Sequence, residues 1–230
     1  LIPHLDSDQR TASDGQKFKV IFNSIHSTYS GKYFGKDKGI TIYSFINNVH
    51  NLFYSTVFSA SDREAWYVID GLLHNDVIRS SVHTTDSHGA TEPIFAVSYL
   101  LGIDFQPRMS HVSQKLMYSM DNLDMNPLEQ IGCTIGPPVD ERLIEVQWDR
   151  ILKLLVTFKL KHNLASLVMK RLNSYAVHNP LYRALSELGK LVRTEFLLRY
   201  IDEEELRHQI HRQQEKMESA QALSRVVAYG

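Results

Sequence analysis

Two kinds of hydrophobic pattern divide this chain, and the order in which they occur limits the folds that it can adopt. Residues 17–25, 39–46 and 51–59 alternate in polarity or are rich in aromatic and β-branched side chains, which predicts three strands of an antiparallel meander. From Glu141 onward, apolar side chains recur at helical spacing and strand signals almost disappear. We therefore expect an α/β fold in which the strands come first and most helices come later.

The stretch between these two parts contains both patterns. A helix is expected over 62–73, a strand over 77–85, a short apolar helix over 93–101 and a short strand over 103–109. With the meander in front, these elements follow the order β-β-β-α-β-α-β.

Helices account for the remaining chain, with one expected over 181–200 and a last one over 202–227. We interpret residues 1–140 as an α/β core, 141–201 as a helical insertion, and 202–230 as a C-terminal helix that returns to the core.

Composition excludes several classes of protein. The chain has 230 residues, an apolar fraction of 43% and a charged fraction of 22%, which argue against disorder. No apolar run approaches the roughly 18 to 20 residues of a bilayer span, so a soluble chain without a membrane partner is expected. A net charge of −1 lacks the basicity of a small nucleic-acid-binding module, so the totals alone argue against nucleic acid.

The single cysteine, Cys133, excludes an internal disulfide framework and fits a reducing cytosol. The first ten residues, LIPHLDSDQR, have neither a basic start nor an apolar core, so no secretory signal is expected. Both ends are abrupt, which suggests a domain from a longer protein.

Three carboxylates stand where an α/β fold places chemistry. Asp14 lies at the beginning of the first strand region, Asp86 follows the fourth predicted strand, and Glu218 lies on the last helix. Phosphodiester cleavage by two Mg²⁺ ions needs such oxygen ligands, because the ions activate the attacking oxygen and stabilise the leaving one. Spacing alone would not justify this interpretation, since the chain has 26 acidic residues.

The sequence motifs around these acids are more specific. In order, they are TASDGQKF, KYFGKDKGITIYSF, WYVIDGLL, HTTDSHGATEPIFAVSYLLGIDFQPRM and RALSELGKLVRTEFLLRYI with QEKMESAQALSRVV. Over almost its full length the chain thereby resembles the catalytic domain of the Tn-three family of large bacterial transposases, which belong to the DDE class. The resemblance implies an RNase-H-like mixed sheet with an all-helical insertion before the final helix, which carries the Glu.

The family's three catalytic, metal-binding acids correspond to Asp14, Asp86 and Glu218 of this sequence. Met217 stands where the family commonly has glycine before the Glu, and Glu215, one turn away, is the alternative acid. The resemblance implies two Mg²⁺ ions, which Mn²⁺ can replace, and replicative transposition. In this reaction the 3′ ends of the transposon are cut and joined to target DNA.

The implied partners are the transposon's terminal inverted repeats and target DNA, with a homodimer of the full-length protein. The implied location is the bacterial cytoplasm, in association with the nucleoid.

Other residues are candidates for contacts with DNA. His83 and His88 flank Asp86 and could contact DNA or orient the site, although most histidines in such a chain are structural. Arg108, after the fifth strand, could bind a phosphate or form a structural salt bridge.

The net charge of −1 conceals an uneven distribution. Residues 1–141 hold 10 basic and 16 acidic side chains, whereas residues 142–200 hold 11 basic and 4 acidic ones. The insertion can therefore lie against a phosphate backbone, through the residues Lys153, Lys159, Lys161, Lys170 and Arg171.

Two other interpretations remain open. One is a catalytically silent domain, derived from a transposase, that binds DNA or a partner. The other is a related RNase-H-like nuclease or recombinase, which would share the acids but not the KYFG and LLGIDFQPR words.

Overall fold

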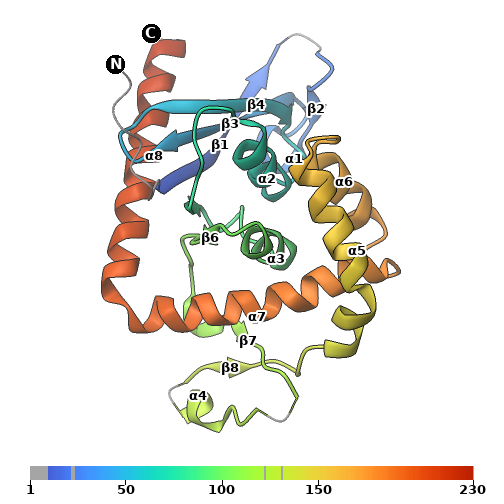
Figure 1. The fold of residues 1–230 in the computed structure, drawn as a ribbon. Coiled ribbons are helices and arrows are strands. Elements are labelled where there is room, and N and C mark those ends of the chain that lie inside the picture. The colour runs from blue at the N-terminus through green and yellow to red at the C-terminus, as the bar shows by residue number, and fades with distance from the viewer. Residues whose placement is uncertain (1–9, 22–23, 122, 131, 230) are drawn as a thin grey trace.

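The computed structural model describes residues 10–21, 24–121, 123–130 and 132–229. Its strands form a mixed sheet with helices on both sides, so the predicted α/β class is confirmed (Figure 1). The strands of this sheet are β1 (Arg10–Val20), β2 (Thr28–Tyr29), β3 (Lys38–Asn47), β4 (Leu52–Ser59), β5 (Val82–Thr85) and β6 (Asp104–Phe105).

Strand β1 is central to the sheet. It pairs antiparallel with β3 on one side and parallel with β5 on the other, and β6 continues the parallel part beyond β5. Strand β4 and the short β2 both pair antiparallel with β3. The long elements therefore follow the predicted order, with a meander first and parallel strands after it.

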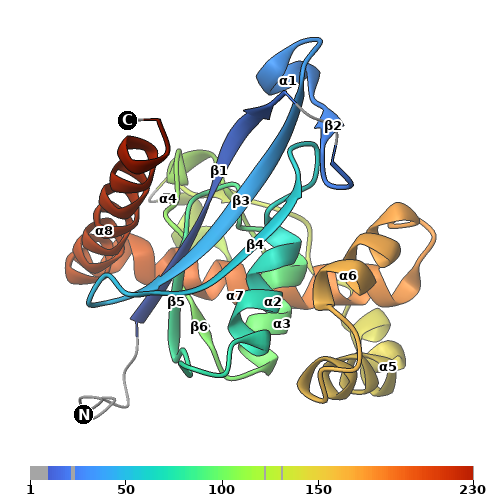
Figure 2. The ribbon, with the colours of Figure 1, turned by 90° about the horizontal axis from the view of Figure 1, so that it is seen from above.

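Eight α-helices occur in the described part of the chain. They are α1 (Gly31–Phe34), α2 (Ala65–His74), α3 (Glu92–Leu100), α4 (Asn126–Gln130), α5 (Glu141–Lys159), α6 (Ala165–Ser174), α7 (Pro180–Asp202) and α8 (Glu204–Tyr229). Helices α2 and α3 cover one face of the sheet and α8 covers the other (Figure 2). Within the described residues, no helix is both long and apolar enough to cross a membrane.

The two faces of the sheet bury different amounts of apolar surface. The main core lies on the side of α2 and α3, with Tyr43, Phe45, Trp66, Phe95 and Phe196 among its buried aromatic residues. This core continues into α5, α6 and α7, so the predicted helical insertion packs directly against the α/β part.

A smaller cluster joins the sheet to α8. It consists of Ala12, Ile46 and Met217, all buried, with Ala220 packed against it. Met217 therefore contributes a buried side chain to the interface between the last helix and the sheet.

The first strand begins seven residues earlier than predicted, at Arg10 rather than at residue 17. Thr11, Ala12 and Ser13 are buried, and their small or polar side chains lack the bulky alternation by which a strand is usually identified. Asp14 consequently lies inside the strand. The strand ends at Val20, five residues before the predicted end at residue 25, and of the residues between them 22–23 lie outside the described residues.

Two predicted strands are shorter in the structure. Strand β5 begins only at Val82, because Asn75 Oδ1 accepts hydrogen bonds from the backbone N–H groups of Val77 and Ile78 and holds that segment in a turn. Strand β6 has only two residues, but the chain stays beside β5, since the backbone N–H of Arg108 donates to Thr85 O at 2.8 Å.

The region between β6 and α5, for which the sequence suggested no element, contains α4, a short 3₁₀ helix (Val112–Gln114) and a small second sheet. That sheet pairs β7 (Leu116–Met117) with β8 (Thr134–Ile135).

Candidate active site

Two aspartates meet because two parallel strands share a register. In the pairing of β1 with β5, Ser13 lies opposite Thr85, and each of these residues precedes an aspartate, Asp14 and Asp86 respectively. The structure therefore brings together two side chains that are 72 residues apart in the sequence. This is the part of the predicted site that strand order alone could suggest.

Asp14 is strongly affected by its surroundings. Burial is the largest cause that raises its pKa, to about 7, and the negative charges of Asp86 and Glu64 raise it further. The backbone N–H of Gly15, which donates to Asp14 Oδ1 at 2.7 Å, and the side chain of Gln221 act in the opposite direction. The carboxylates of the site thus carry more negative charge than the neighbouring hydrogen-bond donors offset.

Asp86 lies in a tight turn after β5. Its Oδ1 accepts the backbone N–H groups of His88 at 3.0 Å and Gly89 at 3.1 Å, and its Oδ2 lies 2.7 Å from His88 Nδ1. These contacts hold the carboxylate in one orientation. His88 therefore orients an acid in this structure, and its exposed ring remains a candidate for a DNA contact.

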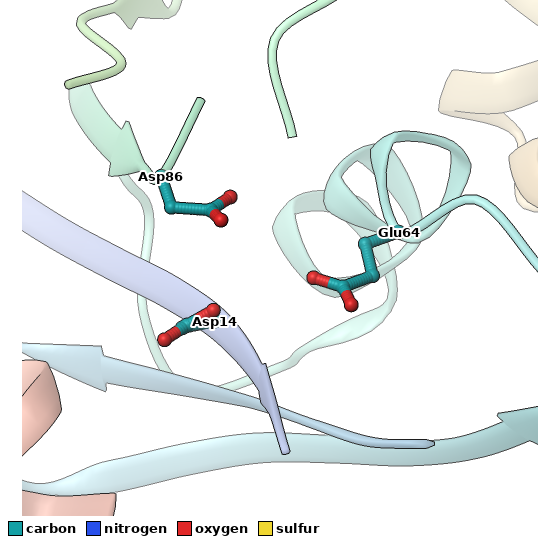
Figure 3. Close-up of side chains that lie close together, drawn as sticks. All are labelled: Asp14, Glu64 and Asp86. Atoms are coloured by element: carbon teal, nitrogen blue, oxygen red, sulfur yellow. The ribbon is translucent and has the colours of Figure 1, made fainter. Parts of the chain in front are cut away.

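A third carboxylate, Glu64, completes the group. One oxygen from each of Asp14, Glu64 and Asp86 lies within 4.8 Å of the others. Figure 3 shows the three carboxylates turned toward a shared space between β1, the end of β5 and the start of α2. Glu64 is buried at the N-terminus of α2 and forms an ion pair with Lys17.

Glu64 was not predicted from the sequence to be a site residue. The signal available was weak, since an acid in the first turn of a predicted helix is common and stabilises any helix. Gly15 is the matching feature on β1, because a Cβ atom there would lie 2.7–2.8 Å from the Glu64 carboxyl group. Only the folded chain reveals this relation between the two positions.

Glu218 lies outside this group of three. Its side chain is 61% exposed, and its Oε1 lies 3.5 Å from Arg108 Nη1. Glu215, the alternative acid, pairs with His211 at 3.2 Å on the same helix. The structure therefore brings Asp14 and Asp86 together and leaves Glu218 paired with an arginine.

Helix α8 is nevertheless held against the strand that carries Asp14. Gln16 Nε2 donates to Gln221 O at 2.9 Å, and Ser224 Oγ donates to Gln16 Oε1 at 3.0 Å. These contacts lie within two turns of Glu218 on α8, so the helix that bears the predicted third acid is fixed beside the site.

His83 is buried, which corrects the expectation that it could contact DNA. Its Nδ1 lies 2.8 Å from Thr11 Oγ1 and its Nε2 lies 2.8 Å from Ser13 Oγ, so the ring links β5 to β1 beneath the aspartates. Burial lowers its pKa to about 3, which keeps the ring neutral. Orientation of the site is the role that remains for it.

The basic residues of the predicted insertion divide into two groups. Lys159 and Lys161 line a pocket of about 1010 Å³ together with Asp76 and Arg79, which precede β5, whereas Asp86 follows that strand. Lys161 also pairs with Asp76 at 2.8 Å. These two lysines are therefore at the end of β5 remote from the carboxylates.

Lys170 lies at the other end, where it pairs with Asp62 at 2.6 Å, two residues before Glu64. Arg171 follows it on α6 and is exposed. Within the described residues, Lys153, Lys159 and Arg171 form no ion pair.

Comparison with known proteins gives a consistent family. Residues 1–230 match the family described as Tn3 transposase DDE domain. The transposase for transposon Tn2501 of Escherichia coli is 34% identical over 222 residues, which cover 94% of this chain and 22% of that protein. The transposase for transposon Tn1546 of Enterococcus faecium is 31% identical over 96% of this chain and 22% of its own length. The chain thus spans about a fifth of these relatives.

Proposed function

Because this chain belongs to the Tn3 transposase DDE domain family, we propose that it is the catalytic domain of a DNA transposase. The reaction proposed is cleavage at the 3′ ends of the transposon followed by joining of those ends to target DNA, in replicative transposition. The observation that carries the proposal is the parallel register that places Asp14 beside Asp86, with Glu64 completing a group of carboxylates.

The sheet supports an RNase-H-like fold as part of the same proposal. Strands β4, β3, β1, β5 and β6 lie side by side in that order, and β3 alone runs in the direction opposite to the other four. In this fold, residues 1–140 and 202–230 form the catalytic core, and residues 141–201 are the helical insertion.

The donor set fits divalent metal ions. Three carboxylates within 4.8 Å repel one another, and the raised pKa of Asp14 records that repulsion together with burial. The grouped ligand atoms come only from carboxylates, which suit Mg²⁺, and Mn²⁺ accepts the same ligands. Bound there, such ions would supply electrostatic stabilisation to the attacking and leaving oxygens of a phosphodiester.

The chain's own residues hold and orient this site. Asp14 and Asp86 provide oxygen ligands from two adjacent strands, and Glu64 or Glu218 provides the third acid. Lys17 holds Glu64 in place, while His88 and the turn after β5 hold Asp86. The proposed partners are transposon ends and target DNA, bound by a homodimer of the full-length protein in the bacterial cytoplasm.

Replacement of Asp86 tests the catalytic proposal. In the full-length transposase, Asp86→Asn keeps the shape of the side chain but removes a charge that would bind metal. We expect strand transfer to fall by at least a hundredfold and Mn²⁺ binding, measured by titration calorimetry, to weaken. Asp149→Asn, at an exposed position on α5, is the matched control and should change neither.

The silent-domain interpretation makes the opposite prediction. If strand transfer by Asp86→Asn equals that of the unaltered protein, the assignment of Asp86 to catalysis is wrong. The same comparison with Glu64→Gln and Glu218→Gln identifies which of these two acids acts as the third ligand.

A further inference from the structure

A groove with basic walls lies at the corner where α7 meets α8. Its volume is about 370 Å³, and its lining includes Arg108, Arg207, His208 and His211, together with three uncharged side chains. None of its lining residues is acidic. Figure 1 shows α8 turning from the end of α7 and running along the side of the sheet, which places this corner below the sheet's edge.

One lining residue of the groove, Arg108, adjoins the candidate active site. The backbone N–H of Arg108 donates to the carbonyl oxygen of Thr85, the residue before Asp86. The Arg108 guanidinium extends toward α8, where its Nη1 lies 3.5 Å from Glu218 Oε1. A polymer that runs from the groove to the carboxylates would therefore pass Arg108.

Arg207 is held in the groove wall without an acidic partner among the described residues. Its Nη1 donates to the carbonyl oxygens of Tyr200 and Ile201, both at 2.7 Å, near the C-terminal end of α7. Because these partners are neutral carbonyl groups, no acidic side chain among the described residues offsets the positive charge of the guanidinium. Its remaining N–H groups are free to bind an anion.

The two histidines have weaker partners. His208 Nε2 lies 3.4 Å from Glu204 and His211 Nε2 lies 3.2 Å from Glu215, in exposed pairs along α8. Exposed pairs of this kind contribute little energy and exchange readily for another anion. The two histidines can therefore exchange their glutamate partners for another anion without loss of core structure.

The part of α8 between His208, in the groove, and Glu218, the partner of Arg108, matches a short run of DNA backbone. His208 precedes Glu218 by ten residues, which corresponds to about 15 Å of α-helix. One strand of duplex DNA advances about 3.4 Å per nucleotide, so this distance spans about four phosphates. The basic groups lie on the scale of several phosphates rather than of one small anion.

We propose that this groove binds the phosphate backbone of the DNA strand next to the phosphate that is cut. Arg108 binds the phosphate nearest the carboxylates, and Arg207, with His208 and His211, binds those farther along α8. The inference rests on the proposed function, because it assigns the path of the strand that enters the same site.

The test measures DNA binding by full-length transposase that carries Asp86→Asn, so that no cleavage interferes. Affinity for a duplex is determined at several KCl concentrations for Arg108→Gln and for Arg207→Gln in that background. Each substitution should reduce the slope of log K against log salt by about one, the effect of one lost phosphate contact. Arg212→Gln, on the same helix but outside the groove and paired with Glu205, should leave the slope unchanged.

Neutral methylphosphonate groups in the DNA give a second measurement, which does not depend on folding of Arg207→Gln. A neutral group at a phosphate beside the cleavage position should weaken binding to the parent protein and have no further effect on Arg108→Gln. Equal slopes for Arg108→Gln and the parent would overturn the groove assignment. It would also be overturned if, at every position tested, a methylphosphonate weakened binding by Arg108→Gln as much as binding by the parent. Strand transfer by Asp86→Asn alone would instead overturn the proposed function, since the groove is judged from binding only.

Discussion

Gly15 is the residue at which strand β1 makes room for a third carboxylate. A side chain there would meet the carboxyl group of Glu64, which is buried and paired with Lys17. A flexible side chain can usually move away from a new methyl group. Glu64 cannot do so without breaking its ion pair or leaving the group that it forms with Asp14 and Asp86.

We therefore expect Gly15→Ala to affect metal binding more than stability. Displacement of Glu64 should lower the affinity for Mn²⁺ by about tenfold or more, in the range found when groups that orient metal ligands are removed. Titration calorimetry measures this affinity, and thermal unfolding reports stability. Gly31→Ala is the matched control, because a Cβ atom at Gly31 has nothing within 4 Å. Equal Mn²⁺ affinity in the two variants would show that Glu64 is not needed at the site.

The role of His83, like that of Glu64, depends on contacts with distant parts of the chain. It lies three residues before Asp86, in a motif that suggested a contact with DNA. Its ring is nevertheless buried between β1 and the aromatic side chains of Phe45 and Phe105. A neutral imidazole has one donor and one acceptor, which suits the two hydroxyl groups of Thr11 and Ser13. The His83 side chain therefore links the two strands, β1 and β5, that position Asp14 and Asp86.

At the scale of elements, two contacts decide how the helices are placed. Gln16 joins β1 to α8 through hydrogen bonds with Gln221 and Ser224. On the opposite side, α3 and α7 cross so closely that a Cβ atom at Gly189 would lie 1.8 Å from the backbone oxygen of Glu92. The first contact uses hydrogen bonds, and the second depends on the absence of a side chain.

The crossing of α3 and α7 predicts a large loss of stability for Gly189→Ala. The new methyl group would meet backbone rather than a flexible side chain, so the two helices must separate and part of the core must be exposed. We expect a cost of about 3 kcal/mol, the upper part of the usual range for an overpacked core, despite the better helix propensity of alanine. Urea unfolding measures it.

Glu195→Ala, at an exposed position on the same helix, should change stability by less than about 0.5 kcal/mol. A Gly189→Ala variant as stable as this control would contradict the close crossing.

At the scale of the whole molecule, the charges of the chain are separated in space as well as in sequence. The carboxylates gather where β1, β5 and α2 meet, while Lys159 and Lys161 lie toward one end of β5 and Lys170 lies toward the other. Lys170 and Arg171 are near the acidic end, and Lys159 and Lys161 are near the other. We therefore expect a DNA duplex that enters the candidate active site to meet the first pair and not the second.

This separation predicts different effects for two double substitutions. Lys170→Ala with Arg171→Ala should weaken DNA binding and reduce the slope of log K against log salt by about one to two. Lys159→Ala with Lys161→Ala removes the same charge at the far end and should leave the slope unchanged. The slopes are measured by fluorescence anisotropy at several salt concentrations. If both double substitutions reduced the slope equally, DNA would contact both groups of basic residues.

Local pattern was sufficient for much of the fold. The order of the long strands and helices and the α/β class followed from periodicity, and Asp14 in the first strand region and Asp86 after the fourth strand were found in motifs such as SDGQ and HTTD. Such features depend on residues close in sequence, and these are what a pattern records. Small buried residues such as Thr11 to Ser13 were missed, because a central strand can be buried without large apolar side chains.

By itself, the sequence determined the order of the long elements, the family, and Asp14 and Asp86 as candidate acids, because these depend on local chemistry and on motifs of a few residues. Only the tertiary structure decided that Glu64 joins Asp14 and Asp86, that His83 is buried, and that Glu218 is paired with Arg108. The physical reason is distance along the chain. Glu64 is 50 residues from Asp14, and Arg108 is 110 residues from Glu218, so their meeting depends on how the sheet and helices pack.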